Sequence, residues 1–259
     1  MAKPLTPAFV RLAVRNFRAA LDFLTMFVVF GQPIFIILVL GVMLSQLIPH
    51  PGGSASYLAY FVPGMISTTA ITGSVLTARI LWLDRRFSMV EQILSGPFRR
   101  VDYLGALFLT SVAFALVEVA LLTAVGVPLA GLPTPPLYGF GIILGTICAT
   151  TLLFSGLLVA IAARTRSSTF FFTIQSVLQS FLVFVSNVYY PVTPGTPAVL
   201  RTVISYNPLS YAADILRDSI GSALNPNDVI GAVLLVVLAV AAFVAAVLSF
   251  RGIRFGPIG

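Results

Sequence analysis

The run LYGFGIILGTICATTLLFSGLLVAIAA, residues 137–163, carries no charged side chain over its whole length, and Arg164 follows it directly. At a rise of about 1.5 Å per residue, a helix of this length crosses the roughly 30 Å hydrocarbon core of a bilayer. Five further apolar stretches of comparable length occupy residues 23–45, 57–81, 103–131, 169–190 and 229–250. The sequence therefore predicts an all-α polytopic integral membrane protein, with six transmembrane helices in one domain over residues 1–259.

The composition supports a membrane protein. Hydrophobic residues make up 58% of the chain and charged residues 9%, which leaves too little polar surface to cover a soluble domain of 259 residues. We therefore expect lipid to cover most of the surface. The single cysteine, Cys148, excludes an intrachain disulfide.

The basic residues fix an expected orientation. Thirteen of the fifteen Lys and Arg residues fall on one side when the six stretches are threaded through a bilayer, and the exceptions are Arg201 and Arg217. Because cytoplasmic segments carry the excess of basic residues, both termini are expected in the cytoplasm. The net charge of +7 then serves topology, and we expect no nucleic-acid partner.

Residues 5–20 precede the first span and have the pattern of an amphipathic helix. Apolar residues recur at helical spacing opposite three arginines, which predicts a helix lying at the cytoplasmic interface. Two roles remain open for it: contact with a partner, or contact with anionic lipid alone. The apolar face comprises Leu5, Phe9, Leu12, Ala13 and Phe17, and the basic face Arg11, Arg15 and Arg18.

The second connection, residues 84–100, predicts a short cytoplasmic helix. Ser88 and Glu91 have the spacing of a capping box, and Gly96 followed by Pro97 predicts the end of the helix. A helix so short needs a groove in which to dock, either the headgroup layer or another protein. The apolar stripe that would dock consists of Met89, Val90, Ile93 and Leu94.

The fifth connection, residues 191–228, contains five prolines, yet its middle is not a polar loop. Asn207 can cap a helix whose first residue is Pro208, and an apolar face follows. We expect a re-entrant or interfacial helical hairpin on the extracytoplasmic side. Arg217 lies between Asp214 and Asp218, which predicts an internal ion pair.

Several enzyme classes are excluded by missing residues. A Walker A loop needs a lysine after its glycines, and the only lysine is Lys3. Zinc-protease and Ser-His sites need histidines on helices, whereas the sole histidine is His50 in the first outer loop. We expect no catalytic site and no metal site in this chain.

Glu118 is the one ionisable residue near the middle of a predicted span. It could be a substrate or proton site, because charge at this depth is costly and marks function. It could equally be a carboxyl kept neutral by desolvation, or one hydrogen-bonded to a neighbouring helix, and the lack of a second intramembrane ionisable group favours this.

Uncharged polar residues inside the spans are candidates for a path. Thr68 and Thr72 share one face of the second span, as do Gln175 and Gln179 in the fifth. Such residues either line a cavity or join helices by hydrogen bonds.

These residues together resemble the permease subunits of ABC-2 type transporters, the six-helix bacterial and archaeal kind, over nearly the whole chain. YLAYFVPG at residues 57–64 is similar to the family's Y-x-x-F-x-x-P-G entry to the second helix. DRRFSMVEQILSGP at residues 84–97 resembles its cytoplasmic segment, and NPLSYAADILR at residues 207–217 resembles its N-P-x-x-Y segment. The chain departs from the family at Phe87 and Ser88, where a glycine commonly precedes the apolar pair.

The resemblance implies a plasma (inner) membrane protein that forms a homodimer with a second permease protomer and pairs with a separate ATPase that holds ATP and Mg. It places the cytoplasmic helix in a groove of that ATPase, with Arg85, Arg86, Met89, Val90, Glu91, Ile93, Leu94, Arg99 and Arg100 as contacts. It also implies a path between protomers lined by Thr68, Thr69, Thr72, Phe172, Gln175 and Gln179.

The resulting hypothesis is an export permease, without catalytic activity of its own, that moves an amphipathic drug, lipid or lipid-linked glycan outward. An ion-coupled secondary carrier using Glu118 is one alternative, and a non-transporting membrane scaffold is another.

Overall fold

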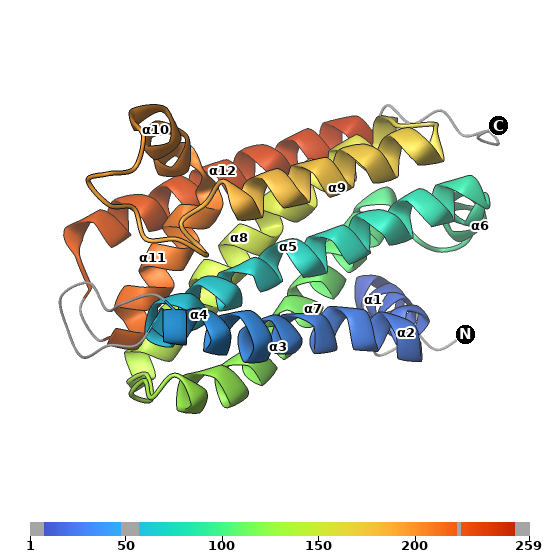
Figure 1. Ribbon diagram of the computed structural model, residues 1–259. Coiled ribbons are helices and arrows are strands. Elements are labelled where there is room, and N and C mark those ends of the chain that lie inside the picture. Colours follow the sequence, from blue (N-terminus) through green and yellow to red (C-terminus); the bar gives the residue numbers. More distant parts are fainter. Residues whose placement is uncertain (1–7, 48–56, 222–223, 252–259) are drawn as a thin grey trace.

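The computed structural model describes residues 8–47, 57–221 and 224–251, so Lys3, Leu5 and His50 lie outside the described part. Within those ranges the chain forms helices and contains no strand. Figure 1 shows the long helices side by side, with α6 (Met89–Ser95) at one end of the bundle and α11 (Pro208–Gly221) at the other. We refer to these as the α6 end and the α11 end.

Five helical stretches are long and apolar enough to cross a membrane: Phe23–Gln46, α5 (Tyr57–Arg86), α7 (Arg100–Leu129), α8 (Leu137–Arg164) and α12 (Pro226–Arg251). They match five of the six predicted spans. The central helix is α5, in whose most apolar stretch 83% of the residues are buried. Its hydroxyls are satisfied within the helix, for example Ser67 Oγ donating to the Gly64 carbonyl at 2.6 Å, as a buried membrane helix requires.

The first of these stretches contains two π-helical turns. It runs as α2 (Phe23–Met26), η1 (Phe27–Gly31), α3 (Gln32–Ile36), η2 (Ile37–Gly41) and α4 (Val42–Leu47). Pro33 has no backbone N–H and its ring would clash with the carbonyl four residues earlier, so the π turn before it relieves that clash. The irregularity was not predicted from the apolar run.

The remaining predicted span, residues 169–190, is helical over only part of its length. α9 covers Ser168–Phe184, 17 residues, and residues 185–190 continue as irregular chain. The Asn207 side-chain amide donates to the carbonyls of Leu182 (2.8 Å) and Val185 (2.9 Å), which satisfies the end of α9. Apolar composition alone does not reveal this remote cap.

Close packing joins α5, α7, α8 and α12. Ser155 Oγ lies 2.7 Å from Ser111 Oγ and 3.0 Å from Ser74 Oγ, so that hydrogen bonds between these hydroxyls form a buried seam joining α8, α7 and α5. At Gly156 an added Cβ would lie 2.6 Å from the backbone of Ala242, so only glycine allows α8 and α12 to approach this closely.

The predicted amphipathic helix is α1 (Ala8–Ala20), and it packs on α7. Leu12 and Ala13 are buried as predicted, and Phe17 stacks on Phe114 with ring centroids 4.4 Å apart. Arg15 is not simply a solvated charge, because its Nη2 lies 2.7 Å from Asp84 Oδ1. Helix α1 is thereby tied to the end of α5.

The short helix α6 ends at Gly96 as predicted, but the capping box is wrong. Ser88 has φ 54° and ψ 20°, the left-handed region, and its side chain caps nothing. An N-cap residue needs extended dihedrals to turn its hydroxyl onto the helix, so Ser88 cannot pair with Glu91. Glycine tolerates this left-handed conformation best.

Two helices form the fifth connection, α10 (Ala198–Tyr206) and α11. The predicted cap is confirmed, since the Leu209 N–H donates to Asn207 Oδ1 at 3.0 Å. The predicted apolar face of α11 is buried against α5, α8 and α12, and it comprises Leu209, Ala212, Ala213, Leu216 and Ile220. The expected hairpin needs a second helix, and α10 is a helix in this connection whose bounds were not predicted.

Candidate functional site

A groove of about 680 Å³ lies between the first span, α5 and α9. Figure 1 shows α5 running between α3 and α9, so that α5 forms the floor and the other two form the walls. The groove follows α5 from Met65 near the α11 end to Arg79 near the α6 end. It therefore extends about 21 Å along α5, which is roughly half the length of that helix.

The middle of the groove contains polar side chains among apolar ones. Three of the six residues predicted for a path, Thr68, Thr72 and Gln179, line it. The other polar lining residues were not predicted from the sequence, because it does not show which faces of the first span and of α9 turn towards α5. These additional residues are Thr25, Gln32, Ser176 and Ser180.

The other three predicted path residues lie outside the groove. Thr69 is fully buried and its hydroxyl donates to the Ile66 carbonyl at 2.8 Å. Phe172 packs on Trp82 with ring centroids 5.4 Å apart. Gln175 is buried, and its Oε1 has no hydrogen-bond partner among the described residues.

The α6 end of the groove carries two opposite charges, Asp22 and Arg79. Asp22 caps α2, accepting from the Thr25 N–H at 2.7 Å and from Thr25 Oγ1 at 2.6 Å. These hydrogen bonds, with a smaller contribution from Arg79, hold the pKa of the Asp22 carboxyl below its ordinary value. Asp22 is thus a carboxylate whose two oxygens are both engaged.

The α11 end of the groove is apolar and aromatic. Val183, Phe184 and Tyr189 line it, and the rings of Phe184 and Tyr189 lie 5.5 Å apart. The Tyr57 hydroxyl donates to the Tyr189 carbonyl at 2.7 Å, which fixes this residue to the start of α5. The lining of the groove is thus charged at the α6 end, a mixture of polar and apolar side chains in the middle, and aromatic at the α11 end.

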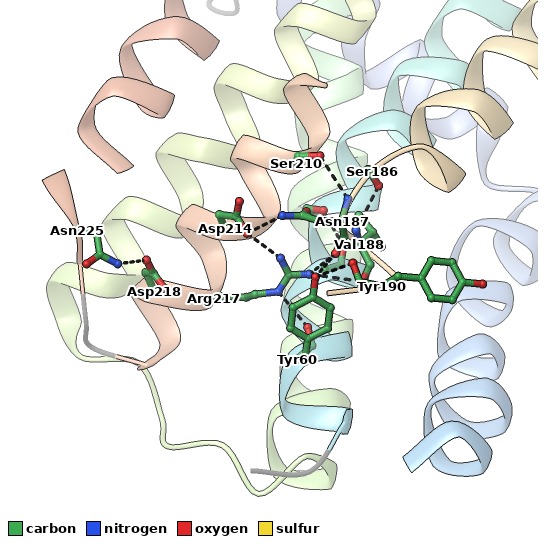
Figure 2. A network of polar contacts seen from close by, with 12 residues as sticks. Tyr60, Ser186, Asn187, Val188, Tyr190, Ser210, Asp214, Arg217, Asp218 and Asn225 are labelled. Carbon is green, nitrogen blue, oxygen red and sulfur yellow. Dashed lines mark hydrogen bonds and ion pairs between the residues drawn. The ribbon is translucent and has the colours of Figure 1, made fainter. Parts of the chain in front are cut away.

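A polar network holds residues 186–190 in place, as Figure 2 shows. Arg217 Nη2 donates to the Asn187 carbonyl at 2.8 Å, and Arg217 Nη1 lies 2.9 Å from Asp214 Oδ1. The predicted ion pair is therefore confirmed for Asp214, whereas Asp218 accepts from the Asn225 amide at 2.6 Å. Tyr60 contributes its hydroxyl to the Asn187 carbonyl.

Gly64 explains the Pro-Gly of the second-span motif. A Cβ at this position would lie 2.6 Å from the Val188 carbonyl oxygen and 3.0 Å from Arg217 Nη2. Only glycine lets α5 meet the irregular segment and α11 at this point.

The apolar stripe of α6 faces the protein itself more than was expected. Val90 is 2% exposed and joins the buried cluster at the α6 end, against which Ile93 and Leu94 also pack. The exposed apolar side chains here are Phe87, 65% exposed, and Met89, 37%. Any partner would meet Phe87 and Met89 before it met Val90.

The four arginines around α6 differ in how far their side chains are free to contact a partner protein. Arg85 Nη1 donates to the carbonyls of Ala162 and Thr165 and so caps the end of α8. Arg86 lies over Trp82, 5.4 Å from the ring centroid, and Arg100 Nη1 donates to the Arg251 carbonyl at 3.1 Å. Arg99 and Arg86 are exposed, and Glu91 is partly exposed.

Glu118 is fully buried in α7, and neither carboxyl oxygen has a hydrogen-bond partner among the described residues. It does not line the groove. Of the two structural alternatives for Glu118, a hydrogen bond to a neighbouring helix is therefore not found among the described residues, whereas burial of the carboxyl is. The described part of the chain also holds no cluster of three His, Cys, Asp or Glu side chains that could bind a metal.

Comparison with known proteins agrees with the motifs. The family profile described as ABC-2 type transporter matches residues 7–220. The chain is also similar to Nodulation protein J of Rhizobium leguminosarum bv. trifolii, with 28% identity over 190 residues, covering 72% of this chain and 70% of that protein.

Proposed function

Because the chain belongs to the ABC-2 type transporter family, we propose that it is the permease subunit of an ATP-driven exporter that moves an amphipathic drug, lipid or lipid-linked glycan outward. The observation that carries the proposal is the groove between the first span, α5 and α9. Polar side chains from all three elements, among them Gln32, Thr72 and Gln179, converge on this one groove, and polar residues gathered inside a membrane bundle mark substrate pathways.

The proposed topology puts the α6 end in the cytoplasm, in agreement with the distribution of Lys and Arg. The sixth crossing is α9 continued by residues 185–190. Helix α9 alone spans about 26 Å, and the irregular segment supplies the rest while α5 and α11 satisfy its backbone. Six crossings return both ends of the chain to the cytoplasm.

The proposed engine is a separate ATPase subunit that binds ATP and Mg and docks on α6. Phe87 and Met89 are the exposed apolar residues of this region, and Arg86 and Arg99 form a basic rim beside them. Val90, Ile93 and Leu94 anchor α6 to the spans through the buried cluster. This division lets force on α6 reach α5 and α7, which flank it in the chain.

A second copy of the chain is proposed to face the groove and complete the path. Lipid would cover the outward faces of the spans. The first span and α9, which border the groove, also carry apolar side chains that lie outside its lining and that no described residue covers: Phe23, Phe27, Phe35, Phe170, Val177 and Phe181.

The carrier and scaffold alternatives receive less support. Glu118 lies outside the groove, where an ion travelling through the groove would not meet it. A non-transporting scaffold gives no reason for polar side chains of three helices to line one groove.

The test reconstitutes the permease with its ATPase in vesicles and follows ATP-dependent movement of a fluorescent amphiphile between leaflets. Thr72→Trp fills the middle of the groove and should stop movement. Val240→Trp is the matched control, because Val240 is 59% exposed on α12, and this variant should not stop movement. Movement that survives Thr72→Trp would overturn the proposed path.

A further inference from the structure

Arg79 is the cation of the groove and lies deeper than the other basic residues of α5. It is seven residues before Arg86, the last residue of α5, which is about 10 Å along the helix axis. Its side chain is exposed and lines the groove. A guanidinium at the boundary between headgroups and hydrocarbon needs an anionic or hydrogen-bonding partner.

The described part of the chain supplies no direct hydrogen-bonding or ion-pair partner, only the longer-range attraction of Asp22. Arg79 makes no hydrogen bond or ion pair with any residue in the described ranges, and the acid nearest in the groove lining is Asp22. Both oxygens of Asp22 already accept from Thr25. The guanidinium therefore presents its planar set of N–H donors to whatever enters the groove.

From this arrangement we infer that Arg79 recognises an anionic headgroup, of the phosphate class, on the transported amphiphile. The inference rests on the proposed path and narrows its substrate class. Guanidinium binds phosphate through paired hydrogen bonds, which gives direction as well as charge. Thr72 and Gln179 lie further along the groove and offer polar contacts as the headgroup moves towards the α11 end.

The open side of the groove suits the rest of such a molecule. The helices that border the groove carry exposed apolar side chains outside its lining, such as Phe27 and Phe181, so an acyl or prenyl tail can stay in lipid against these helices while its headgroup occupies the groove. A free phosphate ion would use Arg79 but gain nothing from these walls. We therefore assign the site to a phosphate attached to an apolar chain.

The experiment compares two fluorescent probes of equal chain length, an alkyl phosphate and the matching alkyl alcohol. Each is titrated with intact purified protein in a neutral glycoside detergent, and fluorescence anisotropy gives the Kd. Wild type should prefer the phosphate probe by about tenfold. Arg79→Gln should abolish the preference while leaving alcohol binding unchanged, and Arg79→Lys should keep part of it.

Arg164→Gln is the control, because Arg164 is exposed at the end of α8 and does not line the groove. It should keep the full preference. If Arg79→Gln also keeps it, Arg79 merely reaches bulk lipid phosphate and the inference is overturned. Displacement of the alkyl phosphate by inorganic phosphate as strongly as by its own unlabelled form would overturn the assignment to an amphiphile.

Thr72→Trp separates this inference from the proposed path. If it removes binding of both probes while Arg79→Gln keeps the preference, the path stands and the anion site fails. If it leaves both probes bound, amphiphiles bind elsewhere, and both proposals fail.

Discussion

Arg217 of α11 lies over the ring of Tyr60 in α5, with its Cζ 3.7 Å from the ring centroid. The same guanidinium reaches the Tyr60 carbonyl through Nε at 3.2 Å and the Asn187 carbonyl through Nη2. One side chain therefore joins the start of α5, the segment after α9 and α11. That segment carries Tyr189, which lines the α11 end of the groove.

Replacement of Arg217 by lysine should destabilise the protein by about 2 kcal/mol, because an ammonium cannot make these divergent contacts from one position. Thermal unfolding in detergent measures the change. Arg201→Lys is the control, since its three carbonyl contacts are exposed and its loss should stay within about 0.5 kcal/mol. Equal unfolding temperatures for Arg217→Lys and Arg201→Lys would show that the contacts of Arg217 do not stabilise the protein.

Substitutions at Ser88 distinguish its left-handed conformation from a helix cap. Ser88→Gly should stabilise the protein by about 0.5–1 kcal/mol, because glycine removes the steric cost of φ 54°. Ser88→Ala should be nearly neutral, since the hydroxyl caps nothing. Thermal unfolding and hydrogen exchange over α6 report both. A loss of about 1 kcal/mol in Ser88→Ala would instead indicate a capping role.

Asp84 should matter more than its place at the end of a span suggests. It accepts from Arg15 at 2.7 Å and from the buried Tyr103 hydroxyl at 2.8 Å, so Asp84→Asn weakens contacts to both α1 and α7. We expect a loss of about 1–3 kcal/mol in thermal unfolding. Glu91→Gln, at a partly exposed carboxylate on α6, should change little. The idea fails if both variants unfold at the same temperature.

Glu118→Gln tests the carrier alternative. Glutamine has the shape of the protonated acid and Glu118 lies outside the groove, so ATP-driven transport should stay within about twofold of wild type. An ion-coupled carrier predicts transport by the chain alone under a proton gradient, abolished by this substitution. Transport assays in vesicles, with and without ATPase, decide between them.

The sequence predicted much of the fold because the length of an apolar stretch and the residues that cap a helix can both be recognised from neighbouring positions in the chain. Five spans, the Asn207 cap, the end of α6 at Gly96 and the pairing of Asp214 with Arg217 all followed from short-range patterns. Features that depend on distant chain were missed. Asn207 ends α9 from 22 residues away, and nothing within α9 signals it.

Only three of the six residues predicted for the path line the groove, because contacts between distant segments decide which helix faces turn towards it. Thr68 and Thr72 share a helix face, but the sequence could not show that this face meets Gln32 of the first span or that Thr69 turns inward. An apolar stripe on a short helix likewise does not tell what covers it. Val90 is covered by the protein's own spans, whereas Phe87 and Met89 remain exposed.

The central claim is that a separate ATPase holds this chain through α6, and co-purification of the intact permease from detergent tests it most directly. A P-loop ATPase should accompany wild type and Val199→Asp, an exposed apolar position on α10 at the opposite end of the bundle. It should be lost from Phe87→Asp and Met89→Asp, with unfolding temperatures unchanged. An ATPase that stays bound to both α6 variants, or is absent from wild type, would contradict the claim.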